Sequence, residues 1–510
     1  MALAESMHIS DILTPHRPDR WHRPAVVHGD STLTYGDLAD RSGRVARWLQ
    51  KGGYRGKKVA LLLPNGPEFL AAYLGAAGAG CVVVPINSAL KPPEIRYILE
   101  DARAGLLLTC REYYPRVAPI RGQLPSLRAV VATDAVVEPG ATRLSDIISA
   151  QPPGPYRVAG LKKTDPLAIM YTSGTTGFPK GVVLTHHNLM STVISCREVY
   201  GTTADDVFIC MLPMWHVYPI TDCVLLPLWL GTTIVSTNED DPAAILELVT
   251  RHRVTVLAGM APLFIALANL DRPCDLRALK LCMSAGAPLP LEVFRRFRER
   301  YGAPITEGYG LTECAATVTM MPVGGNPRAG SVGLPIPGVE VALVDDGGRP
   351  VARGAVGELV VRGPTVMQCY YNNDEATRET IRDGWLYTGD LATQDADGYY
   401  YIVDRKKNMI TVNGVHVYPR EVEMAAYGLE QIAEACVVEA PDAAGHSHVT
   451  MVASLRSPIA AEAVRAYLAE QIADYKVPSR IIFVDELPQT GSGKLARNAV
   501  RDLVIQRCNR

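Results

Sequence analysis

Short apolar runs alternate with segments of helical composition along most of this chain, and this alternation limits the folds that it can adopt. Four runs in the first part of the chain have the length and composition of buried strands, at residues 58–63, 81–85, 104–110 and 129–132. Strands that alternate with helices pack as sheets covered by helices. The sequence therefore predicts an α/β fold with a large layered N-terminal part.

The sequence changes character at residues 404–408, DRKKN. Four charged side chains in five positions are typical of an exposed hinge or domain boundary, although charge runs are also common on solvated faces. Residues 414–510 then show a short αβ pattern of their own. We expect an N-terminal domain over residues 1–404 and a small α+β lid domain over residues 405–510, with the hinge near Lys407.

Composition excludes several function classes. A net charge of -2 gives no reason to expect a nucleic acid or an anionic membrane as the partner. The eleven cysteines contain no CxxC pair, so the sequence indicates neither a disulfide framework nor a zinc site. The N-terminus lacks the basic start and apolar core of a signal peptide, and the longest apolar stretch, residues 70–86, is too short and too rich in glycine to span a bilayer. We expect a cytoplasmic protein with reduced thiols and no transmembrane segment.

A loop rich in hydroxyl groups and glycine follows a predicted strand within residues 169–185, IMYTSGTTGFPKGVVLT. Glycine lets the backbone approach an anion closely, so several N–H groups can converge on a phosphate while hydroxyl groups and Lys180 add donors. The segment is not a Walker loop, because Gly181 and a second strand follow the lysine instead of Ser or Thr and a helix. From the residues alone, an ordinary hairpin turn remains the alternative.

Three later segments offer groups that suit a nucleotide. AGAPLP at residues 285–290 can let a flat ring lie against backbone, and ITEGYGLTE at residues 305–313 offers an aromatic ring for stacking and two glutamates for Mg²⁺. GWLYTGD at residues 384–390 presents a carboxylate at a turn, where it can accept hydrogen bonds from ribose. A tight connection and a capping aspartate are the alternatives. By themselves, His216 in an aromatic background and Lys494 in a Gly/Ser-rich turn are more typical of a core histidine and a surface lysine.

The order and chemistry of these segments resemble one family. YTSGTTGFPKG, residues 171–181, is similar to the phosphate loop of the adenylate-forming enzymes, and the resemblance extends from Leu33 to Arg497. Within that superfamily, which also includes amino-acid adenylation domains and luciferases, the chain resembles an acyl-CoA synthetase. The resemblance implies mixed sheets with helices and a small β-barrel-like subdomain in the N-terminal domain, and a mobile C-terminal lid. It also implies that ATP activates a carboxylic acid as an acyl-adenylate, which then passes to CoA with release of AMP and pyrophosphate.

The resemblance assigns roles to particular residues. The ATP phosphates would contact Thr172, Ser173, Gly174, Thr175, Thr176, Gly177 and Lys180, with Thr312 nearby. The adenosine would lie against Ala285, Gly286, Ala287, Pro288, Glu307, Gly308, Tyr309 and Gly310, with Tyr309 stacked on adenine and Asp390 and Arg405 on the ribose. Mg²⁺ would be held by Thr172 and Glu313. Lys494 would assist adenylation, His216 would border the acyl pocket, Lys407 would be the hinge residue, and Gly414 would lie near the path of the CoA thiol.

Two features limit which acid substrate and which acyl acceptor we expect. Trp215 and His216 stand where amino-acid adenylation domains usually carry an aspartate, so we expect a fatty or aryl acid without an α-amino group. Residues 385–404 lack the insertion typical of ligases that deliver fatty acyl groups to carrier proteins, which favours CoA. Asn413-Gly414-Val415 departs from the pattern of many relatives, so a carrier protein, an amine or an unusual acid stays as the alternative, and an inactive nucleotide-binding scaffold is the remote one. A homodimer is left open.

The acyl pocket is expected to be shaped by residues 215–222 and 259–264, together with Cys314 and Ala315. These residues are mostly apolar, which suits a fatty or aryl acid. These pocket residues do not determine the chain length of the acid.

Overall fold

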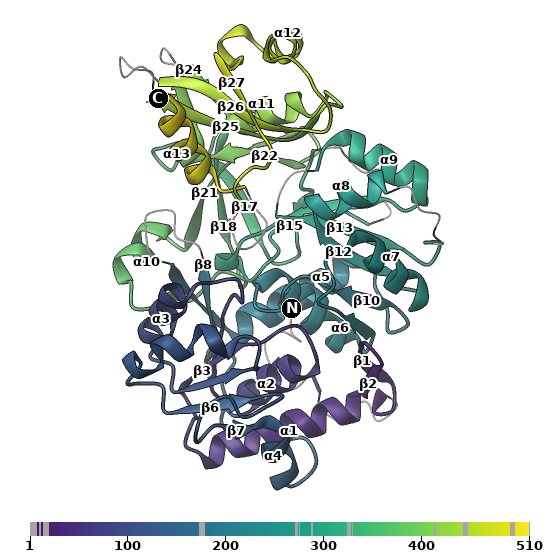
Figure 1. Cartoon of the computed structure of the whole chain (residues 1–510), viewed down its shortest axis with the longest axis vertical. Helices are drawn as coiled ribbons and strands as arrows, with labels where there is room; N and C mark the ends of the chain where they lie inside the picture. Colours follow the sequence, from purple (N-terminus) through teal and green to yellow (C-terminus); the bar gives the residue numbers. More distant parts are fainter. Residues whose placement is uncertain are drawn as a thin grey trace.

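The structure is a computed structural model of the chain (Figure 1). It describes residues 8–9, 12–13, 20–172, 179–270, 274, 276–286, 289–323, 328, 330–412, 415–441, 447–489 and 495–508. Three sheets and their helices make up the chain as far as Arg405, and a smaller sheet with its own helices follows (Figure 1).

The first sheet has eight strands in the order β19-β9-β8-β4-β3-β5-β6-β7. Its strands are β3 (Lys58–Leu62), β4 (Val82–Pro85), β5 (Leu106–Thr109), β6 (Ala129–Ala132), β7 (Thr142–Arg143), β8 (Pro166–Thr172), β9 (Lys180–Thr185) and β19 (Cys369–Tyr370). The accompanying helices are α1 (Tyr35–Lys51), α2 (Pro67–Gly78), α3 (Pro92–Asp101) and α4 (Leu144–Ala150). The four predicted strands are all present and pair in parallel, whereas β8 and β9 form an antiparallel hairpin.

The second sheet has nine strands in the order β16-β15-β14-β13-β12-β10-β11-β1-β2. Its strands are β1 (Pro24–His28), β2 (Ser31–Thr34), β10 (Val207–Cys210), β11 (Thr233–Ser236), β12 (Val256–Met260), β13 (Leu281–Ala285), β14 (Ile305–Tyr309), β15 (Thr319–Met320) and β16 (Leu334–Pro335). The helical elements are α5 (His186–Tyr200), the π-helix η5 (Pro219–Leu225), α6 (Leu226–Leu230), α7 (Pro242–Arg251), α8 (Ala261–Asn269) and α9 (Leu291–Tyr301). Because β10, β12, β13 and β14 are parallel, their carboxyl ends meet at one edge.

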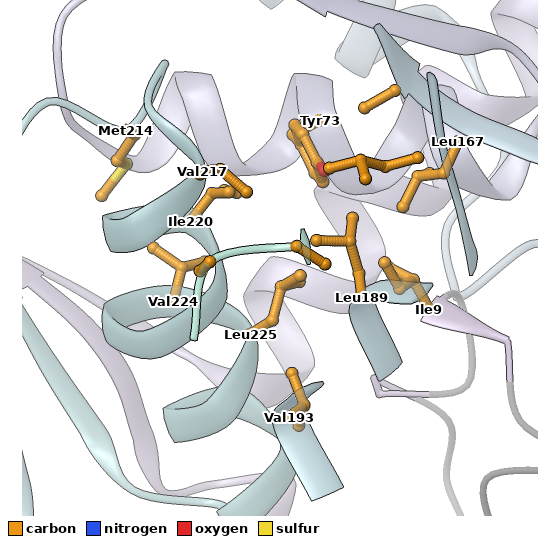
Figure 2. Close-up of a cluster of buried hydrophobic side chains, with 14 of the residues drawn as sticks. Ile9, Tyr73, Leu167, Leu189, Val193, Met214, Val217, Ile220, Val224 and Leu225 are labelled. Carbon is orange, nitrogen blue, oxygen red and sulfur yellow. The ribbon is translucent and has the colours of Figure 1, made fainter. Parts of the chain in front are cut away.

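One buried core joins these two sheets. Figure 2 shows part of it, where Tyr73 from α2 and Leu189 from α5 lie close to Val217 and Ile220 at the start of η5. These side chains are at most 2 % exposed. Burial of this apolar surface fixes the two sheets relative to each other, so the ends of their strands form a stable base for a site.

The third sheet is antiparallel and contains β17 (Glu340–Val344), β18 (Gly357–Arg362), β20 (Ile381–Arg382), β21 (Trp385–Gln394) and β22 (Tyr400–Arg405). It lies between the two large sheets and the C-terminal segment (Figure 1) and corresponds to the expected β-barrel-like part. One expectation was wrong here. Asp390 lies within β21 and not at a turn, because β21 continues through a bulge after Leu391.

The C-terminal segment begins with the hairpin β23 (Ile410–Val412) and β24 (Val415–Val417). It continues with α11 (Pro419–Ala426), β25 (Ile432–Pro441), β26 (Ser447–Leu455), α12 (Ala461–Gln471), β27 (Arg480–Val484) and α13 (Arg497–Cys508). The strands β25, β26 and β27 form one sheet, which has two hydrophobic clusters of its own. Within the described residues, no helix combines the length and the apolar character needed to cross a membrane.

Candidate functional site

The two ends of the Ser/Thr/Gly loop are held by the β8–β9 hairpin. Thr172 and Lys180 pair across the two strands, and both are half-buried. The Lys180 ammonium lies 5.0 Å from the centre of the Tyr370 ring. The other loop residues expected to contact phosphate, Ser173, Gly174, Thr175, Thr176 and Gly177, lie outside the described residues. The two strands thus place the Lys180 side chain where the loop ends.

Glu313 lies on the same side of the site as Lys180. It belongs to the short 3₁₀ helix η6 (Thr312–Cys314), and the Tyr370 hydroxyl donates a 2.8 Å hydrogen bond to its Oε1 atom. Burial, followed by the charge of Glu313, raises the pKa of Tyr370, so this phenol stays a donor. Tyr370 therefore connects Lys180, on one sheet, with Glu313, which follows a strand of the other.

The glycines of the EGYG segment are required by close packing of the chain itself. A Cβ atom at Gly310 would lie 1.5 Å from the carbonyl oxygen of Ala316, and one at Gly308 would lie 2.8 Å from the sulfur of Met320. Ala315 and Ala316 have φ angles of 54° and 97°, which L-residues rarely adopt. This strained turn holds Thr312 and Glu313 in place beside Tyr309.

Asp390 is the centre of a hydrogen-bonded group on the other side of Tyr309. Its Oδ2 atom accepts a 2.6 Å bond from the Tyr309 hydroxyl, and its Oδ1 atom lies 2.9 Å from Nε of Arg405. Asp390 and Arg405 face each other across β21 and β22, and Asp390 is only 4 % exposed. A carboxylate has about four lone-pair sites, so Asp390 can still accept from a ligand hydroxyl.

The carboxyl ends of β13 and β14 provide the surface between these groups. Ala285 ends β13, and Gly286 follows it with a φ angle of 81° that favours glycine. Ala287 and Pro288 lie outside the described residues. Glu307 of β14 accepts a 3.0 Å bond from the N–H of Leu289, so it anchors the connection that follows β13.

His216 lies immediately before the π-helix η5 and is half-buried. Its Nδ1 atom accepts a 3.2 Å hydrogen bond from the N–H of Tyr218, so the neutral ring carries its proton on Nε2. Further along the same segment, Asp222 is fully buried, and the Thr317 hydroxyl donates a 2.9 Å bond to its Oδ2 atom. Burial raises the pKa of Asp222 to about 6, although Thr317, Cys196 and Tyr200 lower it.

The expected hinge is organised by Asp404. This buried carboxylate accepts hydrogen bonds from the N–H groups of Arg405 and Arg420 and from the amide of Asn408, at 2.6, 2.8 and 3.0 Å. Burial and the nearby Arg405 charge lower the pKa of Lys407. Gly414 and Lys494 lie outside the described residues.

Comparison with known proteins decides the family. Residues 16–371 match the family model of the AMP-binding enzymes, and residues 421–494 match the model of the AMP-binding enzyme C-terminal domain. The chain belongs to the AMP-binding enzyme family. The predicted family and fold class are therefore confirmed.

This AMP-binding enzyme has similar relatives of matching length. It is 36% identical over 487 residues to feruloyl-CoA synthase of an Amycolatopsis species, covering 94% of this chain and 96% of the relative. It is 31% identical to the long-chain-fatty-acid–CoA ligase of Yersinia pestis, covering 94% and 91%. Among solved structures, the anthranilate CoA ligase AuaEII in complex with anthranoyl-AMP has a TM-score of 0.93 and 30% identity, covering 99% of this chain and 98% of that one.

Sequence reasoning missed Tyr370 in the candidate site, and it did not foresee the buried polar contact of Asp222. Tyr370 was missed because its partners, Lys180 and Glu313, are far from it in the sequence and only the fold brings them together. Asp222 belongs to residues 215–222, which were expected to shape the acyl pocket as mostly apolar residues, so its burial with Thr317 was not foreseen. A single acidic residue within the run YPITDCVLLPL was the available signal, since a buried carboxylate in such a run needs a polar partner.

Proposed function

We propose that this chain is an AMP-forming acid–CoA ligase that activates a fatty or aryl acid without an α-amino group. ATP and the acid give an acyl-adenylate and pyrophosphate, and CoA then displaces AMP. The relatives named above are ligases or synthases of this kind and span nearly the whole chain. The observation that carries the proposal is the arrangement on the two sides of Tyr309, with Asp390 and Arg405 on one side and Glu313 and Lys180 on the other.

That arrangement suits the two ends of a nucleotide. Asp390 offers acceptor sites to ribose hydroxyl groups, while Lys180 and the loop that starts at Thr172 suit the phosphates. Ala285, Gly286, Glu307, Gly308, Tyr309 and Gly310 lie between them along two strand ends and form the proposed adenine surface. Ala287, Pro288 and the remaining loop residues keep the roles that the family resemblance gives them.

The oxygen ligands offered by this group of residues also suit Mg²⁺. Glu313 and Thr172 offer oxygen atoms, and within the described residues no cluster of three or more His, Cys, Asp or Glu side chains could form a closed metal cage. Mg²⁺ usually takes one or two carboxylates and completes its shell with water and phosphate oxygens. When bound, Mg²⁺ supplies positive charge to the phosphate groups. Tyr370 orients Glu313 for this contact through its hydrogen bond to Oε1.

The reaction needs positive charge more than it needs a nucleophilic side chain. The substrate carboxylate attacks the α-phosphate, and these two anions repel each other. Pyrophosphate then leaves with further negative charge. Lys180 lies where it can stabilise the leaving pyrophosphate, and Lys494 is proposed to stabilise the attacked phosphate. Arg405 and Asp390 hold the ribose, so that the α-phosphate stays aligned with the acid.

The residues proposed to contact the acid favour a substrate without an amino group. Because Nδ1 of His216 accepts from Tyr218, its Nε2–H is a donor, and a donor cannot hold an ammonium group. The same donor can bind a carboxylate or carbonyl oxygen. His216 is therefore proposed to border the reacting end of the acid, with Trp215 packed against it at 5.9 Å between ring centres.

The proposal is tested by measuring acid-dependent pyrophosphate release with ATP and Mg²⁺ over a panel of aryl and fatty acids. Mass spectrometry with CoA as the sole acceptor should then detect the acyl-CoA. Acid-dependent pyrophosphate release without any acyl-CoA would point to a carrier protein or an amine as the acceptor. ATP binding without pyrophosphate release for any acid would indicate the inactive scaffold.

A further inference from the structure

The two ends of the Ser/Thr/Gly loop are hydrogen-bonded to the same helix, α3 (Figure 1). Where β8 leads into the loop, the Tyr171 hydroxyl donates a 2.5 Å hydrogen bond to Oδ2 of Asp101. Where the loop returns to β9, the Tyr97 hydroxyl donates a 3.1 Å bond to the carbonyl oxygen of Pro179. Tyr97 and Asp101 are four residues apart on α3, so they lie on one side of the helix. One face of α3 thus contacts both ends of the loop.

Each contact is one residue away from a residue proposed to bind the phosphates of ATP. Tyr171 precedes Thr172, and Pro179 precedes Lys180. The two phosphate-binding residues are also joined to each other, because Thr172 pairs with Lys180 across the hairpin and its hydroxyl donates a 3.4 Å bond to the Lys180 carbonyl. The two bonds to α3 therefore restrict the main chain next to both residues.

The Tyr171 ring is confined by its packing as well as by its hydrogen bond. Gly181 pairs with Tyr171 across the hairpin, and a Cβ atom at Gly181 would lie 3.2 Å from Cζ of the ring. The Tyr97 ring packs edge-on against the Tyr171 ring, with 6.5 Å between ring centres. Burial, followed by the hydrogen bond to Asp101, raises the pKa of Tyr171, so its phenol keeps the proton that it donates. Tyr171 is therefore held in one position against α3.

Lys180 is restrained through both its main chain and its side chain. The bond from Tyr97 to Pro179 restrains the main chain, and the Tyr370 ring lies 5.0 Å from the ammonium group. A cation that is already in place stabilises the charge of a leaving group without the cost of reorganisation. The contacts with α3 thus matter most for the phosphates that leave as pyrophosphate, which AMP lacks.

We propose that Tyr97 and Asp101 are positioning residues, which hold Lys180 and Thr172 in place for the leaving pyrophosphate of ATP. The inference rests on the proposed ligase function. Loss of either hydrogen bond frees one end of the loop, so the contacts with the two outer phosphates weaken. The proposed ribose contacts of Asp390 come from β21 and stay in place. The two bonds therefore support acid activation, and the later displacement of AMP by CoA does not need them.

The test compares ATP with AMP in Tyr97→Phe and Tyr171→Phe, which lose one hydroxyl each and keep the ring. Isothermal titration calorimetry without acid should show that the affinity for ATP with Mg²⁺ falls about three- to tenfold in each variant, while the affinity for AMP is unchanged. Acid-dependent exchange of pyrophosphate into ATP should fall by a similar factor. Thioester formation from a supplied acyl-adenylate should keep the wild-type rate.

Variants of Asp101 test whether the bond to Tyr171 is the cause. Asp101→Asn keeps an oxygen that can accept from the Tyr171 hydroxyl, so its ATP affinity should lie between those of the wild type and Tyr171→Phe. The double variant Asp101→Ala/Tyr171→Phe should bind ATP as weakly as the weaker single variant and no more weakly, since both changes remove the same bond. Additive losses in the double variant would contradict the assignment.

Tyr114→Phe is the matched control. The Tyr114 hydroxyl donates to Oε2 of Glu138, so the variant loses the same kind of phenol–carboxylate bond between the segments that follow β5 and β6. It should keep the wild-type affinity for ATP and the rates of both half-reactions.

Two results would overturn the inference. Equal losses of ATP and AMP affinity in Tyr97→Phe and Tyr171→Phe, or equal losses in both half-reactions, would show a purely structural role. Unchanged ATP affinity in both variants would show that α3 does not position the loop. A wild type without acid-dependent exchange for any acid would refute the ligase function, and the comparison of ATP with AMP would still decide the role of α3.

Discussion

The proposed nucleotide end and the proposed acid end of the site both contain a buried aspartate, but the two aspartates have very different partners. Asp390 has a phenol on one oxygen and a guanidinium on the other. Asp222 receives one hydroxyl on Oδ2, and its Oδ1 atom is buried without a hydrogen-bond partner, as are the hydroxyl groups of Tyr218 and Thr221 beside it. The proposed nucleotide end is thus held in one arrangement, whereas the proposed acid end has buried polar atoms without hydrogen-bond partners among the described residues. The following changes test that difference, from the largest expected effect to the smallest.

Asp390→Asn should damage the nucleotide end most. The amide keeps the shape but loses the ion pair with Arg405 and half of the acceptor capacity offered to ribose, and charged hydrogen bonds contribute about 1.5–3 kcal/mol each. We expect kcat/KM for ATP to fall by about two to three orders of magnitude, with little change in the KM for the acid. Steady-state kinetics with each substrate varied in turn measures both. Asp397→Asn, which removes an exposed partner of Arg328, is the control and should have wild-type kinetics.

Lys180→Ala should slow acid activation by about 3 kcal/mol, since it removes a positive charge placed where the leaving pyrophosphate develops negative charge. Thioester formation from a supplied acyl-adenylate should be spared, because pyrophosphate takes no part in it. Stopped-flow or quench measurements of each half-reaction distinguish the two. Equal rate losses in both half-reactions would show that Lys180 does not act on the leaving group. Lys57→Ala, at an exposed lysine, serves as the matched control.

Asp222→Asn should change the pH dependence of folding. The pKa of Asp222 is raised from 3.8 to about 6, so the folded state binds its proton more tightly than the unfolded state does. Stability from this group is therefore present below about pH 4 and is lost as the pH rises to about 6, a loss of roughly 3 kcal/mol. The variant should lack this decline between pH 4 and 6 in urea unfolding. Thr317→Val removes the hydroxyl that lowers the pKa, so its decline should extend to higher pH; a decline unchanged in both variants would contradict the assignment.

His216→Ala should have the smallest effect and should act on the acid alone. Loss of one Nε2–H donor to the carboxyl group should raise the KM for the acid about tenfold, with the KM for ATP unchanged. A change in the KM for ATP instead would place His216 at the nucleotide end. His252→Ala, at the end of α7, is the control.

A nucleotide end could be proposed from the sequence because its residues lie in short continuous segments. Few kinds of structure need the combination of residue types found in the loop at residues 169–185. The same holds for the segment at residues 305–313. The same reasoning placed Asp390 at a turn, because it could not foresee that β21 passes through a bulge and continues. It assigned Gly308 and Gly310 to the nucleotide, and the structure adds a packing reason for both glycines.

The polar contacts of Asp222 could not be predicted in the same way, because its partner Thr317 comes from a distant segment. Asp222 meets Thr317 only after the sheets have formed. A single sequence gives the residue types but not these pairings. The polar contacts of Asp222 therefore required the fold.

The strained turn after Glu313 has one more consequence. Gly310 touches the carbonyl of Ala316, and Ala315 and Ala316 occupy conformations that cost roughly 1–3 kcal/mol each, so the segment between them has no room to adjust. Glu313 is thus held in one position by the turn that follows it. If His216 borders the acid as proposed, we expect acids of different size to be accommodated by the segment around His216 and not by a shift of Glu313.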